Sequence, residues 1–215
     1  IDTWIDYISM AKRLNMDLEN PLVHRPKDLK KEHDRLIKVL KEKGLTLLAG
    51  EILERFGNVE TRQKEIKEKF EYSDKKYAII VPDSVEDMLR ESEALRLCFD
   101  QIDIYWDRIE QRESYLMWLR RKEDIDKPWY VLEVQPGGRV RQKRTLGDNQ
   151  NDDFNEAVKF IKKWQKVIQK RMTPEDLALA KESDFKREAE FKKVRQDGDR
   201  IHRGKLAGKL LVEVL

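Results

Sequence analysis

The sequence predicts an α+β protein with a helical N-terminal part, a small central antiparallel sheet and C-terminal amphipathic helices. Apolar residues recur at helical spacing through the first third of the chain. They alternate with polar residues over residues 114–149 and return to helical spacing after residue 152. A change of period from 3.6 to 2 and back indicates a sheet between helical segments.

The first third of the chain is predicted to be helical. One helix extends to about residue 14, and an extended connection follows it. A second helix opens at Pro26 and has Gly44 as its predicted stop. A third helix is predicted over residues 45–70, with a break near Gly57.

The central part contains the strand signals. Residues 77–81 are apolar and rich in β-branched side chains, and Pro82 follows them, so they predict the first strand. Ser84, with Asp87 three residues later, is typical of a helix N-cap. Further strands are predicted at residues 114–120, 129–135 and 139–145, the last two joined by a turn at Pro136-Gly137-Gly138.

Two helices are expected at the C-terminal end. Asp152-Asp153 begin an amphipathic helix that runs to Arg171, and Thr173-Pro174-Glu175-Asp176 is a start signal for the last helix. The apolar stripe of that last helix is thin, which predicts packing at the edge of the domain or against a partner. We expect a helical region at 1–75, an α+β core at 76–171 and a helical extension at 172–215.

Composition limits the class of protein. Of 215 residues, 40% are charged and 39% hydrophobic, and the apolar content excludes a fully disordered chain. Lys and Arg number 45 against 42 Asp and Glu, so any basic binding surface must be local. The chain begins with Ile and ends in an apolar run at 210–215, which suggests a piece of a longer protein.

The cellular setting is predicted from what the sequence contains. Cys98 is the single cysteine, which favours a reducing compartment, and we expect a cytoplasmic protein. No apolar run approaches the roughly 18 residues of a membrane span, and the N-terminus does not resemble a signal peptide. We therefore expect no membrane association.

The basic residues of the hairpin and the following helix predict an anion-binding surface. A three-residue turn would place Arg139, Arg141 and Lys143 on one outward face together with Glu133 and Gln135. The helix after residue 152 carries lysines along one face, and if both groups converge, a nucleic-acid backbone is the natural ligand. The alternative is a solvated ribbon and helix whose charges only maintain solubility. The predicted surface comprises Arg139, Arg141, Lys143, Arg144, Lys159, Lys162, Lys163, Lys166 and Lys170.

Enzymatic sites have weaker support. Asp83 at the end of one predicted strand, with Glu133 and Gln135 on a later strand, is similar to a metal-dependent nuclease centre, although such a centre usually has Lys where Gln135 stands. Cys98 has no histidine near it in the sequence to activate it, so we expect a buried structural thiol. No spacing predicts a metal site or a cofactor.

An ordered set of motifs resembles the PcfJ-like proteins, which are encoded on conjugative plasmids, integrated elements and phages. Trp4 to Met10, the stretch from Pro26 to Asp34, the strand ending at Pro82 and the strand from Pro128 to Val134 follow the family pattern. Departures occur at Ser92, Leu97 and Phe99-Asp100; if relatives use a histidine–cysteine centre, Leu97 removes half of it. The matching single residues are His33, Asp34, Glu91, Cys98, Tyr105, Arg120, Glu133, Gln142 and Asn149.

The resemblance implies a setting in mobile elements and DNA transfer without implying a reaction. We therefore predict a non-enzymatic accessory protein that binds nucleic acid, DNA in preference to RNA, or a nucleoprotein complex. Glu133, Gln142 and Asn149 would fix the hairpin geometry or hold a small ligand. One alternative is an enzyme acting on nucleic acid through Asp83, Glu133 and Gln135, and another is a protein-interaction module that uses residues 173–215.

Overall fold

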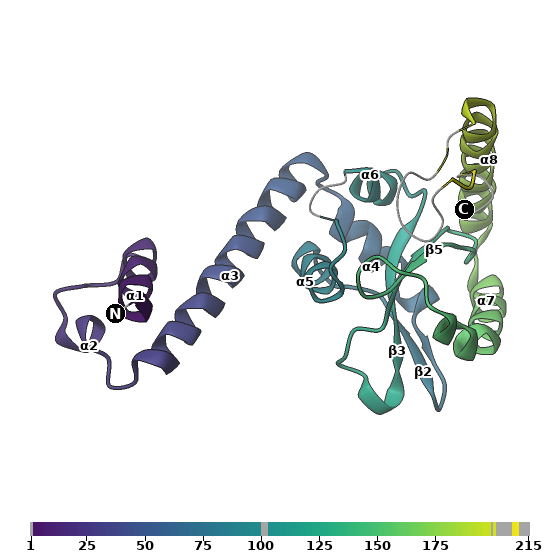
Figure 1. Cartoon of the computed structure of the whole chain (residues 1–215). Helices are drawn as coiled ribbons and strands as arrows, with labels where there is room; N and C mark the ends of the chain where they lie inside the picture. The colour runs from purple at the N-terminus through teal and green to yellow at the C-terminus, as the bar shows by residue number, and fades with distance from the viewer. Residues whose placement is uncertain (1, 100–102, 199, 201–207, 211–215) are drawn as a thin grey trace. The chain divides into compact units, whose positions relative to one another are not determined.

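The computed structural model describes residues 2–99, 103–198, 200 and 208–210 (Figure 1). It divides into two compact units, residues 1–51 and 52–215. Helix α3 (Leu29–Arg55) contains the division, and α4 (Val59–Phe70) belongs to the second unit. The boundary between the two compact units therefore falls at residue 51, within α3. The regions 1–75, 76–171 and 172–215 stay predictions.

The first unit is a small helical cluster. It comprises α1 (Asp2–Arg13), α2 (Pro21–His24) and most of α3, around a core of Tyr7, Ala11 and Leu36. The Tyr7 hydroxyl donates a 2.8 Å hydrogen bond to the carbonyl of Val23, which holds α2 against α1. Helix α3 continues through Gly44, so the predicted stop there is wrong. A glycine inside a helix costs about 1 kcal/mol but ends it only with a capping conformation.

The second unit is built on an antiparallel five-stranded sheet, with strand order β1-β2-β3-β4-β5. Three of the predicted strands are confirmed as β3 (Tyr115–Arg121), β4 (Tyr130–Val134) and β5 (Val140–Arg144). The first predicted strand is β2 (Tyr77–Ile80), which pairs with a short strand, β1 (Tyr72–Ser73), that the sequence pattern did not indicate. Together with the helices, this sheet confirms the predicted α+β class.

Helices cover both faces of the sheet. One face, here called the Glu133 face, carries Leu116, Trp118 and Glu133 and lies against α5 (Val85–Leu95) and α6 (Ile104–Glu110). The opposite face, here called the Tyr130 face, lies against η2 (Asp152–Ala157) and α7 (Val158–Arg171) (Figure 1). The predicted cap at Ser84 is confirmed, since its hydroxyl accepts a 3.1 Å bond from the Asp87 amide.

Helix α8 (Pro174–Asp197) begins where the start signal predicted it, and Thr173 and Asp176 form a capping box there. It passes the β4–β5 turn, where a Cβ added at Gly137 would lie 3.3 Å from the Cβ of Ala180. The buried residues of α8 are Ser183 and Arg187, whereas the apolar Phe185 is 73% exposed. The helix therefore packs at the end of the sheet through polar side chains.

None of the helices in the described ranges combines the length and apolar character that a membrane span requires. Most of the C-terminal apolar run, residues 211–215, lies outside the described residues. The predicted role of that run in binding a partner stays a prediction.

The hairpin turn supplies a test of the packing between β4–β5 and α7. Gly138 has φ of +81°, and a Cβ there would lie 3.0 Å from Cδ1 of Ile168. We expect Gly138→Ala to lower the free energy of unfolding by about 1–3 kcal/mol, because both the backbone and the contact oppose it. Urea denaturation followed by tryptophan fluorescence in a Trp4→Phe background reports the second unit alone, since the other tryptophans belong to it.

Gly57→Ala is the matched control, since Gly57 lacks positive φ and an added Cβ would meet only the Leu53 carbonyl at 3.6 Å. We expect this change to leave stability within about 0.5 kcal/mol of the parent or to raise it. Equal effects of the two substitutions would contradict the assigned role of the turn.

Candidate functional site

Helix α7 presents lysines on its solvent face. Its buried residues, Phe160, Ile161, Trp164 and Ile168, pack toward the core, and the helix contains no Asp or Glu. None of Lys159, Lys162, Lys166 and Lys170 forms an ion pair with a carboxylate within the described ranges. Lys163 lies with its ammonium 5.8 Å from the ring centroid of Tyr72. The α7 lysine surface is here defined as Lys159, Lys162, Lys163, Lys166 and Lys170.

The hairpin does not place its basic residues on one face. The register shifts between Glu133 and Val134, so that Val134 pairs with Val140 and Glu133 pairs with Gln142. A β-bulge of this kind inserts one extra residue into one strand and redirects its side chains. Arg141 consequently points to the Glu133 face, whereas Lys143 points to the Tyr130 face, where its ammonium lies 4.2 Å from the Phe154 ring centroid.

The hairpin arginines are also neutralised. Arg141, with a side chain only 8% exposed, pairs with Glu133 and Glu190. Arg139 pairs with Asp184 at 3.4 Å, and Arg144 pairs with Asp148 at 3.0 Å. The predictions that Arg141 points outward and that hairpin and helix form one cationic patch are therefore wrong. The physical reasons are the bulge, the pairing of Arg139 and Arg141 with acidic residues of α8, and the pairing of Arg144 with Asp148. The alternation pattern of the hairpin cannot reveal these contacts.

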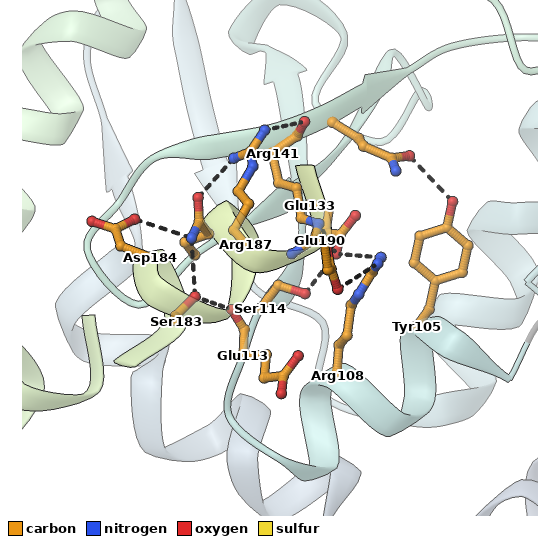
Figure 2. A network of polar contacts seen from close by, with 12 residues as sticks. Tyr105, Arg108, Glu113, Ser114, Glu133, Arg141, Ser183, Asp184, Arg187 and Glu190 are labelled. Atoms are coloured by element: carbon orange, nitrogen blue, oxygen red, sulfur yellow. Dashed lines mark hydrogen bonds and ion pairs between the residues drawn. The ribbon is translucent and has the colours of Figure 1, made fainter. Parts of the chain in front are cut away.

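A buried polar network takes the place of the predicted patch on the Glu133 face (Figure 2). The Glu133 side chain is 2% exposed, and its Oε1 accepts a 2.6 Å bond from the Ser114 hydroxyl. The same oxygen lies 3.3 Å from Nη1 of Arg108 and 3.4 Å from Nε of Arg141. Glu190 on α8 bridges the other side of both arginines, at 3.5 Å from Nη2 of Arg108 and in close contact with Nη2 of Arg141. The network thus joins α6, β4, β5 and α8.

Arg187, a buried residue of α8, extends this network toward Gln135. Its Nη1 donates a 2.7 Å bond to Oε1 of Gln135, and its Nη2 lies 3.4 Å from the carbonyl of Arg141. The Gln135 amide donates to Ser183 at 3.0 Å and to Asp184 at 3.1 Å. Burial lowers the pKa of Arg187, and the nearby Arg141 and Arg139 lower it further. The guanidinium therefore lies in a desolvated environment close to two other arginines.

Several of the residues that carry the family resemblance pair with one another. Glu91 on α5 accepts two bonds from Arg120 on β3, at 2.8 and 2.5 Å, and both side chains are 6% exposed. The Tyr105 hydroxyl bonds the side chain of Gln142 at 3.3 Å, and Gln142 is the cross-strand partner of Glu133. The presence of these residues in the family pattern has a structural explanation, because their contacts hold α5 and α6 on the sheet.

The other resemblance residues make local contacts. Asn149 donates to the Leu146 carbonyl at 2.8 Å and bridges to Thr145 just beyond β5, so it shapes the end of the hairpin. His33 is half-buried on α3, and its Nδ1 lies 3.4 Å from Oδ1 of Asp34. His33 therefore lies at the edge of the helical core of the first unit.

Cys98 is exposed, so the prediction of a buried structural thiol is wrong. Helix α5 ends at Leu95, and Arg96 adopts a left-handed conformation with φ of 54°. This conformation ends the helical periodicity, so that Leu97 and Phe99 are buried while Cys98 faces solvent.

The structure does not bring together Asp83, Glu133 and Gln135. Asp83, which is 65% exposed, forms a close ion pair with Lys67. It follows β2, and β3 separates β2 from the β4 strand of Glu133, which leaves about 10 Å between their backbones. Glu133 and Gln135 are engaged with arginines, and the described residues contain no group of three His, Cys, Asp or Glu that could hold a metal ion.

Sequence reasoning did not identify Arg108, Arg187 and Glu190 as part of the site. All three look like ordinary surface charges of helices, and nothing in their local spacing separates them from their neighbours. The one available signal was the single charged residue of β4. Glu133 lies within an otherwise apolar run and requires a cationic partner once it is buried.

The Glu91–Arg120 pair provides a test of these assignments. We expect Arg120→Met to lower the free energy of unfolding of the second unit by about 3–5 kcal/mol, because Glu91 would remain buried without its partner. The double variant Glu91→Leu/Arg120→Met should recover most of that loss, because no charge is left unpaired. Urea denaturation in the Trp4→Phe background measures both effects, and equal destabilisation by the single and double variants would contradict the assignment.

Comparisons with known proteins place the chain in a family. An uncharacterized protein of Listeria innocua is 25% identical over 170 residues, which cover 77% of this chain and 36% of that relative. The chain thus spans about a third of the length of the relative, and no solved structure matches it significantly. The PcfJ-like protein family matches residues 3–161, which cover nearly all of the first unit and, from the second unit, the whole sheet and the first residues of α7. The chain belongs to the PcfJ-like protein family.

Proposed function

We propose that this chain is a non-enzymatic, cytoplasmic accessory protein of a mobile genetic element that binds the phosphate backbone of nucleic acid through the α7 lysine surface. DNA is the favoured ligand. The observation that carries the proposal is the charge of α7, which presents lysines along its solvent face and contains no acidic residue. In a chain with 42 acidic residues, such a helix is a local excess of positive charge.

The chemistry of lysine supports a contact with the backbone. An ammonium on a flexible stem attracts phosphate as a point charge and imposes little geometry. The α7 lysines lack the fixed, hydrogen-bonded arrangement that reads base edges. We therefore expect binding that depends strongly on salt and weakly on sequence.

The nuclease alternative loses its support from the geometry of its residues. Asp83 lies two strands away from Glu133, and Glu133 is held by Arg108 and Arg141. A catalytic role would require Glu133 to leave two cations and take up a metal ion. One observation supports the protein-interaction alternative: the apolar side chains of Leu177 and Phe185 on α8 are exposed.

The proposal is tested by the anisotropy of labelled single- and double-stranded DNA and RNA at about 50 and 200 mM salt. If the five lysines each contact one phosphate, the affinity should fall on the order of 10²-fold or more between these concentrations. Changing Lys159, Lys162 and Lys166 to Glu should weaken binding more than tenfold. The same change should reduce the magnitude of the log–log salt slope by about 2.7.

The control variant changes Lys30, Lys31 and Lys38 to Glu, which alters the net charge of the chain equally. These lysines are exposed on α3, in the first unit. Binding that falls equally in the two variants would indicate a general charge effect and contradict the α7 surface. Absence of any salt-dependent binding by the wild-type chain would remove the proposal.

A further inference from the structure

A pocket of about 390 Å³ opens between α6, β5 and α8, next to the buried network of Figure 2. Its size is within the roughly 300–1,000 Å³ range of small-molecule sites. Arg108, Arg141, Arg187 and Lys193 line it, together with the acidic Glu190 and Asp197. The pocket thus gathers cations from three elements.

The inner contacts of two of these arginines are fixed. Arg108 Nη1 and Arg141 Nε both face the buried carboxylate of Glu133, at 3.3 and 3.4 Å. This carboxylate is held in turn by Ser114 at 2.6 Å. A guanidinium that is anchored on one side presents its remaining N–H groups in a set direction, which lowers the entropy cost of binding an anion.

The outer contacts of the same arginines are made by the partly exposed carboxylate of Glu190, which an incoming anion could displace. Glu190 places one oxygen on Nη2 of Arg108 and the other on Nη2 of Arg141. Its side chain is 43% exposed and comes from α8, which is held to the sheet through polar residues. Phosphate oxygens match guanidinium groups in the same bridging manner and carry more charge than a carboxylate. Glu190 therefore occupies the position that a phosphate group would take.

Arg187 adds a cation that lacks an acidic partner. No carboxylate of the described residues lies within ion-pair distance of its guanidinium, which bonds the neutral groups of Gln135 and of the Arg141 backbone. Buried charges are normally paired, so an anion in the pocket would complete this arrangement.

Part of the pocket wall is apolar. Ile104 is exposed. The Arg187 guanidinium lies over the Phe191 ring, with its Cζ 5.1 Å from the ring centroid. Aromatic rings and guanidinium planes are the surfaces on which nucleobases stack. The wall thus provides a place for a flat ring next to the cations.

We propose that this pocket binds the phosphate group of a nucleotide, either free or at the end of a strand, in exchange for the Glu190 carboxylate. Arg108 and Arg141 hold the phosphate, Arg187 and Lys193 add positive charge, and Phe191 with Ile104 contacts the base. The site lies on the Glu133 face, whereas the α7 lysine surface lies on the other side of the sheet, so the inference goes beyond the proposed function.

The test is calorimetric titration of the full chain with adenosine 5′-monophosphate, inorganic phosphate and adenosine. We expect the nucleotide to bind more tightly than phosphate, and adenosine to show no binding. Glu190→Gln should tighten nucleotide binding about five- to tenfold, because the competing carboxylate is removed while the side-chain size is kept. Glu188→Gln, a change at an exposed position of the same helix, should have no effect.

Two further variants should weaken nucleotide binding. Lys193→Glu changes an exposed residue of the pocket rim and should reduce affinity at least tenfold without loss of the fold. Arg187→Met should have a similar effect on affinity, with the fold checked by circular dichroism. The inference is overturned if Glu190→Gln binds the nucleotide no more tightly than wild type, or if Lys193→Glu binds it equally well.

An oligonucleotide pair separates the two sources of the phosphate. A single strand with a 5′-phosphate should compete with the free nucleotide better than the same strand without it if strand ends are bound, and equally if only free nucleotides are bound. The variant with Lys159, Lys162 and Lys166 changed to Glu should retain its nucleotide affinity. Loss of nucleotide binding in that variant would overturn the pocket assignment, whereas loss of polymer binding alone concerns the α7 surface.

Discussion

The arrangement of the second unit depends on a carboxylate buried within the sheet. Glu133 lies on β4, between apolar neighbours, and a charge at this depth requires close partners. The partners come from separate parts of the fold, with Ser114 just before β3, Arg108 on α6 and Arg141 on β5. Because both arginines then require a second acceptor, Glu190 fixes α8 as well. One acidic side chain thus sets the position of two helices and of the bulged strand beside it.

This network explains how α8 packs with so few apolar contacts. Its buried positions are Ser183 and Arg187, and Lys186 adds an ion pair with Glu113 at 2.8 Å. Polar contacts of this kind give a defined orientation but little net stabilisation, since desolvation offsets most of the Coulombic attraction. Helix α8 is therefore well oriented and weakly held, and its exposed apolar side chains, Leu177 and Phe185, remain on its outer surface.

Local signals in the sequence predicted most of the helices and strands, but not β1 or the continuation of α3 through Gly44, whereas long-range contacts determine the site. The caps at Ser84 and Thr173 and the alternating strands could be predicted because each depends on residues a few positions apart. The bulge at Glu133–Val134 could not, since it depends on which partners the side chains find across the sheet. That shift moved Arg141 from the surface to the network and left Lys143 on the opposite face. Likewise, Arg187 and Glu190 are three residues apart on a helix of mixed charge, and only the packing of α8 distinguishes them from surface residues.

The division of basic residues between the two faces follows from the chemistry of their side chains. Arginine binds carboxylates in a fixed, bidentate geometry and tolerates burial, and the basic residues of the Glu133 network are arginines. Lysine keeps its ammonium hydrated, and the exposed charges of α7 are lysines, except for Arg171, which donates to three carbonyls at the end of α4. A sheet with helices about 10 Å away on each face separates the two groups. A short nucleic-acid segment cannot contact both groups at once, so the proposed backbone binding by the lysines and the proposed phosphate binding by the arginine pocket are predicted to be independent of each other.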